Sequence, residues 1–225
     1  MGLAKMSYSE QWDQVYGANQ NIIEWPWSDV VSLAHRYCKH LFDIEASILE
    51  IGCGTGANIP FFQAKGFTYY GIDGSTKIVD TLRKIYPKYK DNFKCQDFTR
   101  TLCFHKEFDL VLDRAAITHN DTESIKRTLK KIESQLSRDG ILLAIDWFST
   151  KHMASKTGNY VDDYTRINIP KGQFYGVGNV HFSDQEHLTE LFSGLEVLMM
   201  REKVITNSIP DNDIFSAWDI VAKRK

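Results

Sequence analysis

The sequence predicts an α/β protein built from stacked strand–helix–strand units. Short apolar runs alternate along the chain with segments of helical period, which is the pattern of such units. A glycine-rich loop also follows the first apolar run and precedes a helical segment, where parallel α/β sheets place their ligand loops. The chain has 225 residues, which is enough for one sizeable domain with an insert.

Seven apolar runs are predicted to be strands, and helices are expected between most of them. The helix after the second strand carries Ile78 and Val79 on its apolar face and ends before Pro87. A helix over 57–65 is expected earlier in the chain. The predicted strands are 47–51, 68–72, 92–95, 108–112, 141–145, 195–200 and 216–222.

Two later helices have recognisable start signals. Asn120 is expected to cap the first of them, with Glu123 three residues on, and Gly140 is expected to end it. Ser183 with Glu186 gives the second helix a similar start. The inward stripe of the first helix is Ile125, Leu129, Ile132 and Leu136.

Two segments do not follow the alternation of predicted strands and helices. Residues 1–45 are predicted to form an N-terminal helical cover, and 46–225 the main domain. Residues 147–182 lack a clear period, and a stretch of this length inside a compact domain is usually functional. We expect it to be a lid-like insert that binds the substrate; the alternative is a surface excursion with its own small apolar cluster. The aromatic residues expected in its pocket are Tyr160, Tyr164, Phe174 and Tyr175.

Composition narrows the choice of partners and compartment. A net charge of −2 gives no reason to expect a nucleic-acid partner. No apolar run approaches the roughly 20 residues of a membrane span, and the first ten residues do not resemble a signal peptide. The four cysteines form no Cys-x-x-Cys pair. We therefore expect a cytoplasmic protein, monomeric or homodimeric, without a membrane partner.

The most informative stretch is the glycine loop at 52–56. Its glycines permit positive φ angles and allow a ligand to approach the backbone closely. Asp73 stands 21 positions after Gly52, at the end of the second predicted strand, where a carboxylate can accept both hydroxyls of a ribose. A tight turn followed by a helix-capping Asp is the alternative. The spacing Gly52-x-Gly54-x-x-Ala57 also fits the loose dinucleotide fingerprint.

The run Glu50-x-Gly52-x-Gly54-x-Gly56 resembles motif I of class I S-adenosylmethionine-dependent methyltransferases. Three further stretches match that family in order: 71–75, 95–98 and 108–113. The resemblance covers roughly 48–146 and implies a Rossmann-like sheet of seven strands, mostly parallel with the last antiparallel, and helices on both faces. It also implies S-adenosylmethionine as cofactor and S-adenosylhomocysteine as product.

The same resemblance implies which residues meet the cofactor. In this family an N-terminal helix often closes over it, and Trp12 and Tyr16, four residues apart, can do so here; plain packing is an equal alternative. Asp113 is expected to orient Arg114 or the amino-acid end of the cofactor. The complete expected set is Glu50, Gly52, Cys53, Gly54, Gly56, Asp73, Gly74, Ser75, Asp97, Phe98, Asp113, Arg114, Trp12 and Tyr16.

Few residues are expected to take part in the chemistry itself. His119 is the candidate general base, because imidazole titrates near neutral pH; packing against the cofactor is its alternative role. The pair Asp113 and Asp146 suggests a metal site like that of catechol O-methyltransferases. Trp147 stands where that family has Asn, so no metal is expected. His152 and His181 have no ligand spacing and are expected at the surface.

The predicted function is methyl transfer to an oxygen, nitrogen or sulfur of a small molecule, a metabolite or a sugar. The loop after the fourth strand lacks the Asp/Asn-Pro-Pro-aromatic motif and the Pro-Cys pair of nucleic-acid methyltransferases. An NAD(P)-dependent oxidoreductase and a non-catalytic cofactor-binding module stay as alternatives. An RNA or protein methyltransferase would need a basic or extended groove.

Overall fold

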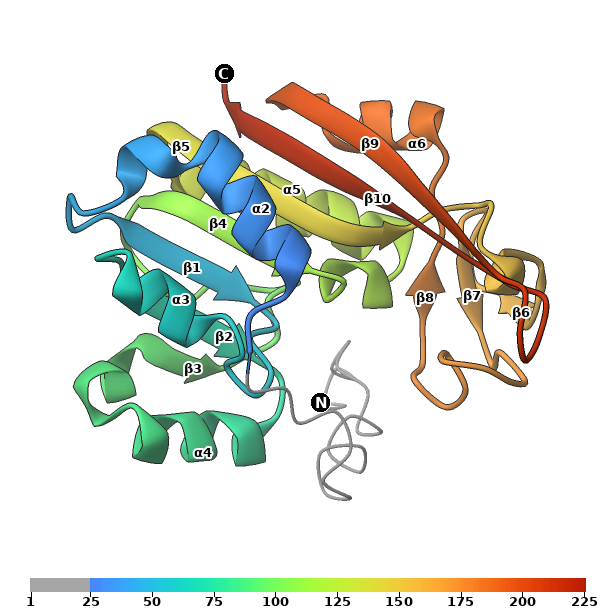
Figure 1. The fold of residues 1–225 in the computed structure, drawn as a ribbon, viewed down its shortest axis with the longest axis horizontal. Coiled ribbons are helices and arrows are strands. Elements are labelled where there is room, and N and C mark those ends of the chain that lie inside the picture. The colour runs from blue at the N-terminus through green and yellow to red at the C-terminus, as the bar shows by residue number, and fades with distance from the viewer. Residues whose placement is uncertain (1–24) are drawn as a thin grey trace, which may run out of the picture.

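A computed structural model describes residues 25–225, and its main sheet confirms the predicted fold (Figure 1). The sheet has seven strands in the order β3-β2-β1-β4-β5-β10-β9. Strands β1 to β5 run parallel, while β10 is antiparallel to both of its neighbours. The strands are β1 (Ser47–Ile51), β2 (Thr68–Asp73), β3 (Phe93–Cys95), β4 (Phe108–Arg114), β5 (Leu136–Phe148), β9 (Leu195–Asn207) and β10 (Asp213–Arg224).

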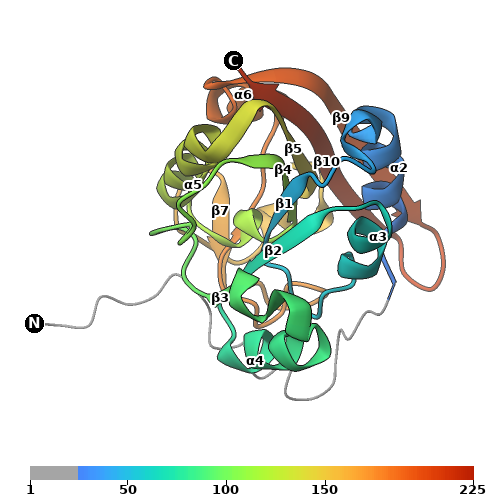
Figure 2. The same cartoon turned by 90° about the vertical axis from the view of Figure 1, so that its left-hand side faces the viewer.

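Helices cover both faces of this sheet (Figure 2). Neighbouring residues on a strand point to opposite faces, so Ile48 packs with one layer of helices and Leu49 with the other. The first layer contains α2 (Ser28–Tyr37), α3 (Ile59–Ala64) and α4 (Thr76–Ile85); the second contains α5 (Thr122–Gln135) and α6 (Gln185–Leu191). Within residues 25–225, no helix is long and apolar enough to pass through a membrane.

The boundaries of α5 differ from the prediction. Asp121, not Asn120, caps the helix, because its Oδ1 accepts the backbone N–H of Ser124 at 2.8 Å. The Asn120 amide instead donates to the Ile117 carbonyl at 3.1 Å. The helix ends at Gln135, and β5 begins at the next residue, so Gly140 lies within a strand.

The start of α6 and the length of the last strands also differ. Asp184 caps α6 in place of Ser183, and its Oδ1 accepts the N–H of His187 at 2.9 Å. In both helices an Asp carboxylate lies one residue beyond the expected cap. Strands β9 and β10 contain 13 and 12 residues, because they pair with each other as a long hairpin far beyond their apolar cores.

The insert forms a small unit beyond the carboxyl ends of β4 and β5 (Figure 1). It has a three-stranded sheet of β6 (Asn159–Tyr160), β7 (Thr165–Ile167) and β8 (Val180–His181). The expected surface position of two histidines is wrong, because His152 is 5% and His181 0% exposed. Burial is tolerated because hydrogen bonds satisfy both rings: His152 Nδ1 accepts from Ala154 N, and His181 pairs with Thr165 and His187.

Candidate functional site

The glycine loop forms a tight bend after β1. Gly52, Gly54 and Gly56 have φ angles of +66°, +48° and +81°, which residues with a side chain rarely adopt. A Cβ on Gly52 would lie 2.3 Å from Ala116 Cβ, so this glycine also lets the loop after β4 come close. The N–H groups of Gly52 and Cys53 both donate to the Ile72 carbonyl, at 2.8 and 3.0 Å. The bend is therefore fixed against the end of β2.

Asp73 joins this bend to the next helix. One carboxylate oxygen accepts the N–H of Gly54 at 2.9 Å, and the other accepts the N–H of Ser75 at 2.9 Å. Ser75 caps α4 through the N–H of Ile78, and the Gly74 carbonyl accepts from the Cys95 thiol. The structure thus brings the predicted residues of the second strand onto the glycine loop.

Asp97 and Phe98 follow β3 at the same edge of the sheet. The Asp97 carboxylate accepts from the Thr99 N–H at 2.9 Å and from the Thr99 hydroxyl at 2.6 Å. Phe98 packs against the core beside α5. Gln96 N donates to the Asp73 carbonyl at 2.9 Å, which keeps this loop next to the acidic loop after β2. Neither Asp97 nor Phe98 is among the described residues that line the cavity below.

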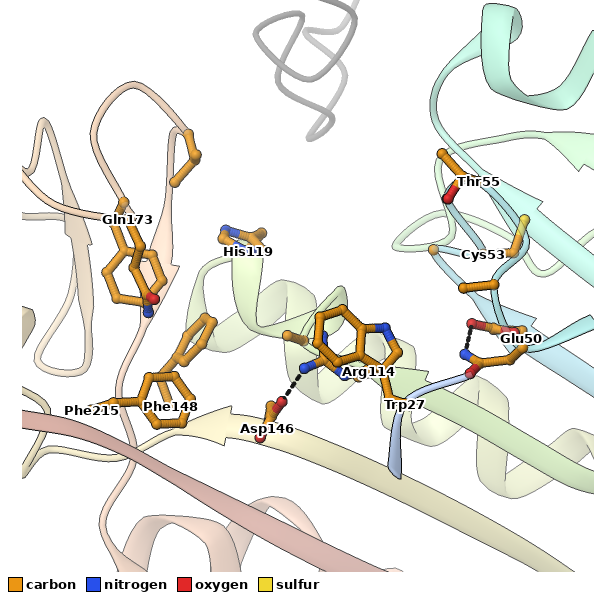
Figure 3. A pocket seen from close by; sticks show the side chains of 17 residues that line it. Trp27, Glu50, Cys53, Thr55, Arg114, His119, Asp146, Phe148, Gln173 and Phe215 are labelled. Atoms are coloured by element: carbon orange, nitrogen blue, oxygen red, sulfur yellow. Dashed lines mark hydrogen bonds and ion pairs between the residues drawn. The ribbon is translucent and has the colours of Figure 1, made fainter. Parts of the chain in front are cut away.

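A cavity of about 500 Å³ lies at the carboxyl ends of β1, β4 and β5 (Figure 3). This is where the strand order reverses, with β2 on one side of β1 and β4 on the other, the usual ligand position in open α/β sheets. Its described lining is Trp27, Glu50, Gly52, Cys53, Gly54, Thr55, Ala57, Asn58, Arg114, Ala115, His119, Asp146, Phe148, Gln173, Phe174, Val177 and Phe215.

Glu50 and Asn58 form a buried polar pair on the glycine-loop side of the cavity. Asn58 Nδ2 donates to Glu50 Oε1 at 2.9 Å, and the Tyr69 hydroxyl donates to the other Glu50 oxygen. Burial raises the pKa of Glu50 to about 7. Asn58 Oδ1 is buried without a hydrogen-bond partner. Nothing in the sequence singled out Asn58, because an Asn seven residues after the end of a strand belongs to no motif.

Arg114 lies between the glycine loop and the insert (Figure 3). Its guanidinium carbon is 3.4 Å from the centre of the Trp27 ring, and its Nη2 is 2.5 Å from Asp146 Oδ2. Arg114 Nε is buried and has no hydrogen-bond partner. Trp27 was not predicted to belong to the site, since only the fold brings the start of α2 to the end of β4.

Asp113 lies behind the site rather than in it. Its buried carboxylate accepts from Ala116 N at 3.1 Å, Ile117 N at 3.0 Å and Trp147 Nε1 at 2.6 Å. These bonds shape the loop after β4, which carries the cavity-lining residues. Arg114 forms its ion pair with Asp146. That Asp113 orients Arg114 or the amino-acid end of the cofactor stays a prediction.

Three carboxylates, of Asp29, Asp146 and Asp219, come close enough to suggest a metal site, with oxygens within 4.8 Å of one another. The Lys203 ammonium lies among them, at 3.2, 2.6 and 2.7 Å from these residues in that order. A metal ion would have to displace this ammonium and the Arg114 contact with Asp146. The cluster is therefore an ion-pair network, and nothing in the sequence linked Lys203 to Asp146.

His119 lines the cavity beside the insert. Its Nδ1 lies 3.0 Å from the Asn179 carbonyl oxygen, which can only accept, so Nδ1 carries the proton. Burial lowers the pKa of His119 to about 4, which leaves the ring neutral at pH 7 with its lone pair on Nε2. Trp12 and Tyr16 lie outside the described residues.

Of the four aromatic residues predicted for the pocket, only Phe174 lines it. Tyr160 and Tyr175 are 68% and 71% exposed. The Tyr164 ring stacks on His187, with centroids 3.6 Å apart, away from the cavity. Phe148 and Phe215 take their places, because the last residues of β5 and the early part of β10 meet the insert here.

Residues 48–140 match the family model described as a methyltransferase domain. This match covers 93 of the 225 residues and supports the resemblance to class I S-adenosylmethionine-dependent methyltransferases. The seven-stranded sheet of the chain is the one that this resemblance implied. S-adenosylmethionine is the cofactor of this family, which favours the methyltransferase over the oxidoreductase alternative.

Two relatives match about half of this chain. A malonyl-[acyl-carrier protein] O-methyltransferase of Priestia megaterium is 30% identical over 119 residues, 50% of this chain and 42% of that protein. A phosphoethanolamine N-methyltransferase of Plasmodium falciparum is 29% identical over 119 residues, 50% of this chain and 45% of that protein. The chain therefore matches less than half the length of either relative.

Solved methyltransferase structures share the fold over most of the chain. One from Methanosarcina mazei has a TM-score of 0.67 at 18% identity and covers 89% of this chain and 98% of its own. The 1,6-didemethyltoxoflavin N1-methyltransferase of Burkholderia thailandensis has a TM-score of 0.67 at 14% identity, over 100% of this chain and 92% of its own. At these identities the likeness concerns the fold alone.

Proposed function

We propose that this protein transfers a methyl group from S-adenosylmethionine to an oxygen, nitrogen or sulfur nucleophile of a small molecule. One observation carries the proposal. One cavity extends from the glycine loop to an aromatic wall that includes a neutral histidine, and two residues of its lining, Asn58 and Arg114, each have a buried polar atom without a partner. The first part suits a polar cofactor and the second part suits its acceptor.

The two partnerless atoms match the amino-acid end of the cofactor in their chemistry. Asn58 Oδ1 is an acceptor beside the Glu50 carboxyl, and together they suit an ammonium group. Arg114 Nε is a donor in a cationic group and suits a carboxylate. Asp73, whose carboxylate is bonded to the glycine loop, is our assignment for the acceptor of the ribose hydroxyls. Trp27 lies against Arg114 and covers this part of the cavity.

When bound, the cofactor would supply an electrophilic methyl group on its sulfonium, whose sulfur would keep the electron pair of the broken carbon–sulfur bond. The proton of the nucleophile then has to be taken up by the protein. His119 Nε2 takes that proton, because Nδ1–H is held by the Asn179 carbonyl. The remaining task of the chain is to align nucleophile and methyl group and to exclude water.

Two observations support a small-molecule acceptor. The insert covers the acceptor side of the cavity with Phe174 and Val177, so that side is a pocket and not an extended groove. The two relatives are named for methylating a malonyl group on an acyl carrier protein and for methylating phosphoethanolamine. A net charge of −2 gives no support to a polyanionic substrate.

Calorimetry with S-adenosylhomocysteine tests the cofactor assignment. We expect the wild type to bind it and not to bind NADH. Asp73→Asn should weaken binding about 10- to 100-fold, because a hydrogen bond to a charged carboxylate contributes about 1.5–3 kcal/mol. Asp80→Asn, on the exposed side of α4, is the control and should bind normally. Tight NADH binding, or equal affinity for Asp73→Asn and wild type, would refute the assignment.

Turnover separates an enzyme from a cofactor-binding module. Purified protein is incubated with S-adenosylmethionine and a panel of small phenols, thiols and amines, and the release of S-adenosylhomocysteine is measured. We expect release to depend on one acceptor class. Cofactor binding without acceptor-dependent release from any class would favour the non-catalytic module.

A further inference from the structure

We infer that the acceptor subsite takes a flat aromatic or heteroaromatic ring that bears both an X–H nucleophile and a hydrogen-bond acceptor. We also infer that Gln173 is the specificity residue that recognises the hydrogen-bond acceptor of this ring. This inference rests on the proposed function, since it concerns the acceptor side of the same cavity. It follows from the aromatic wall, from the hydrogen-bond chemistry of two histidines and from the charges of the lining.

The wall of the subsite is aromatic and firmly packed. Phe148 and Phe174 meet edge to face with centroids 4.6 Å apart, and both are buried. Phe182 supports Phe174 from behind at 5.7 Å. Such rings present faces and edges on which a further aromatic ring gains about 0.5–1.5 kcal/mol beyond its buried area. A flat ring is therefore a better occupant than an aliphatic chain.

The orientation of the Gln173 amide follows from its neighbour His152. His152 Nδ1 accepts the backbone N–H of Ala154 at 3.0 Å, so Nδ1 has the lone pair and Nε2 of the neutral ring carries the hydrogen. Gln173 Nε2 lies 3.2 Å from this Nε2. Two N–H groups cannot form a hydrogen bond with each other, so we assign the Gln173 amide to the flipped orientation, with its oxygen against His152.

This orientation leaves the NH₂ group of Gln173 on the other side of its amide. Gln173 lines the cavity on the side of the insert, away from Arg114 (Figure 3). The NH₂ group is thus a donor for an acceptor atom on the bound ring, a ring nitrogen or a carbonyl oxygen. His119 has the complementary role, because its Nε2 accepts from the X–H group.

The charges of the lining argue against aliphatic ammonium and phosphate acceptors. The Asp146 carboxylate is neutralised by Lys203 and Arg114, and Glu50 belongs to the glycine-loop side. Among the described lining residues no other carboxylate is available for a cation, and Arg114 is the only Lys or Arg. A phosphate would therefore meet a single arginine that already has an ion pair.

The binding of four probes tests the inference. Each probe is titrated in the presence of saturating S-adenosylhomocysteine, and its binding is measured by ligand-observed NMR. They are 6-hydroxyquinoline, 2-naphthol, decahydro-2-naphthol and phosphoethanolamine. 2-Naphthol lacks only the ring nitrogen of 6-hydroxyquinoline, and decahydro-2-naphthol lacks only the aromaticity of 2-naphthol. We expect affinity to fall in the order given, about 2- to 10-fold at each of the first two steps, with no binding of phosphoethanolamine.

Variants identify the role of Gln173. Gln173→Glu keeps an oxygen for His152 but loses the donor, so 6-hydroxyquinoline should bind it no better than 2-naphthol does. Tyr175→Ala, an exposed aromatic two residues away, is the matched control and should keep the wild-type order. The inference would be overturned if Gln173→Glu preferred 6-hydroxyquinoline to 2-naphthol as strongly as the wild type does. It would also be overturned if decahydro-2-naphthol or phosphoethanolamine bound more tightly than either aromatic probe. If the wild type did not bind S-adenosylhomocysteine at all, that result would instead contradict the proposed function.

Discussion

Asp146 Oδ2 lies 2.5 Å from Arg114 Nη2, and Oδ1 of the same carboxylate lies 2.6 Å from Lys203 Nζ. Three strands meet in this arrangement, since Arg114 ends β4, Asp146 lies near the end of β5 and Lys203 belongs to β9. The carboxylate is almost fully buried, so its interactions are only weakly screened by water. Asp146 therefore holds the cationic group of the cavity in place.

Asp146→Asn should destabilise the protein. The change removes a carboxylate that pairs with two partly buried cations, those of Arg114 and Lys203. Breaking a buried ion pair lowers the free energy of unfolding by about 3–5 kcal/mol. Asn is the appropriate replacement because Asp146 has a φ of +56°, which Asn tolerates well. Urea unfolding measures the effect. Asp80→Asn removes the exposed pair with Arg83 and should change stability by less than about 1 kcal/mol.

Gly52→Ala should be much more harmful than Gly172→Ala. Both glycines have positive φ angles, +66° and +79°, so both substitutions introduce backbone strain of about 1–2 kcal/mol. Only at Gly52 would the new Cβ collide with another atom, 2.3 Å from Ala116 Cβ, whereas nothing lies within 4 Å at Gly172. Overpacking adds about 1–3 kcal/mol, which unfolding midpoints should reveal. Equal losses at the two positions would contradict the observed contact.

Cofactor affinity should increase with pH around neutrality. Burial raises the pKa of Glu50 to about 7, so the carboxyl is largely protonated at pH 6 and largely ionised at pH 8. If the ionised form binds the ammonium of the cofactor, the affinity for S-adenosylhomocysteine rises about tenfold between these values. Calorimetry at several pH values measures this. Glu50→Gln, which does not titrate, should remove this dependence; a slope that persists in Glu50→Gln would assign it to another group.

The pH–rate profile should lack an inflection near 6.5. His119 is buried and its pKa is lowered to about 4, so it stays neutral, and able to accept a proton, well below pH 6. We expect kcat/KM for the acceptor, measured at saturating cofactor, to fall only as the pH approaches about 4. His119→Gln should lower kcat by roughly 10²- to 10⁴-fold. An unchanged rate in His119→Gln would exclude its role as the base.

The sequence predicted the structural features that depend on local interactions. The strand–loop–helix order, the positions of the glycines and the acid after β2 depend on hydrophobic period and on backbone geometry over a few residues. Helix caps were predicted one residue early at both α5 and α6, because Asn120, Asp121, Ser183 and Asp184 all have side chains that can cap. Which one does so depends on where the packed chain enters the helix.

Long-range contacts explain the remaining differences. His152 and His181 carry no sign of burial in the sequence, since their partners come from the folded insert. Trp27, Asn58 and Lys203 reach the site from α2, from the start of α3 and from β9. Four aromatic residues of the insert were predicted to form the acceptor pocket, but only Phe174 lines it, and Phe148 from the end of β5 and Phe215 from the start of β10 supply the other rings.

The sequence by itself indicated a glycine loop at which a ligand can bind, because glycines at positive φ angles and a carboxylate at a fixed spacing are properties of a short stretch of chain. The resemblance of its motifs to a methyltransferase family implied the cofactor. Only the tertiary structure decided the ion-pair partners of Asp146, the tautomers of His119 and His152 and the shape of the acceptor pocket. These depend on burial and on partners distant in the chain, and desolvation acts only once the sheet and its insert have packed together.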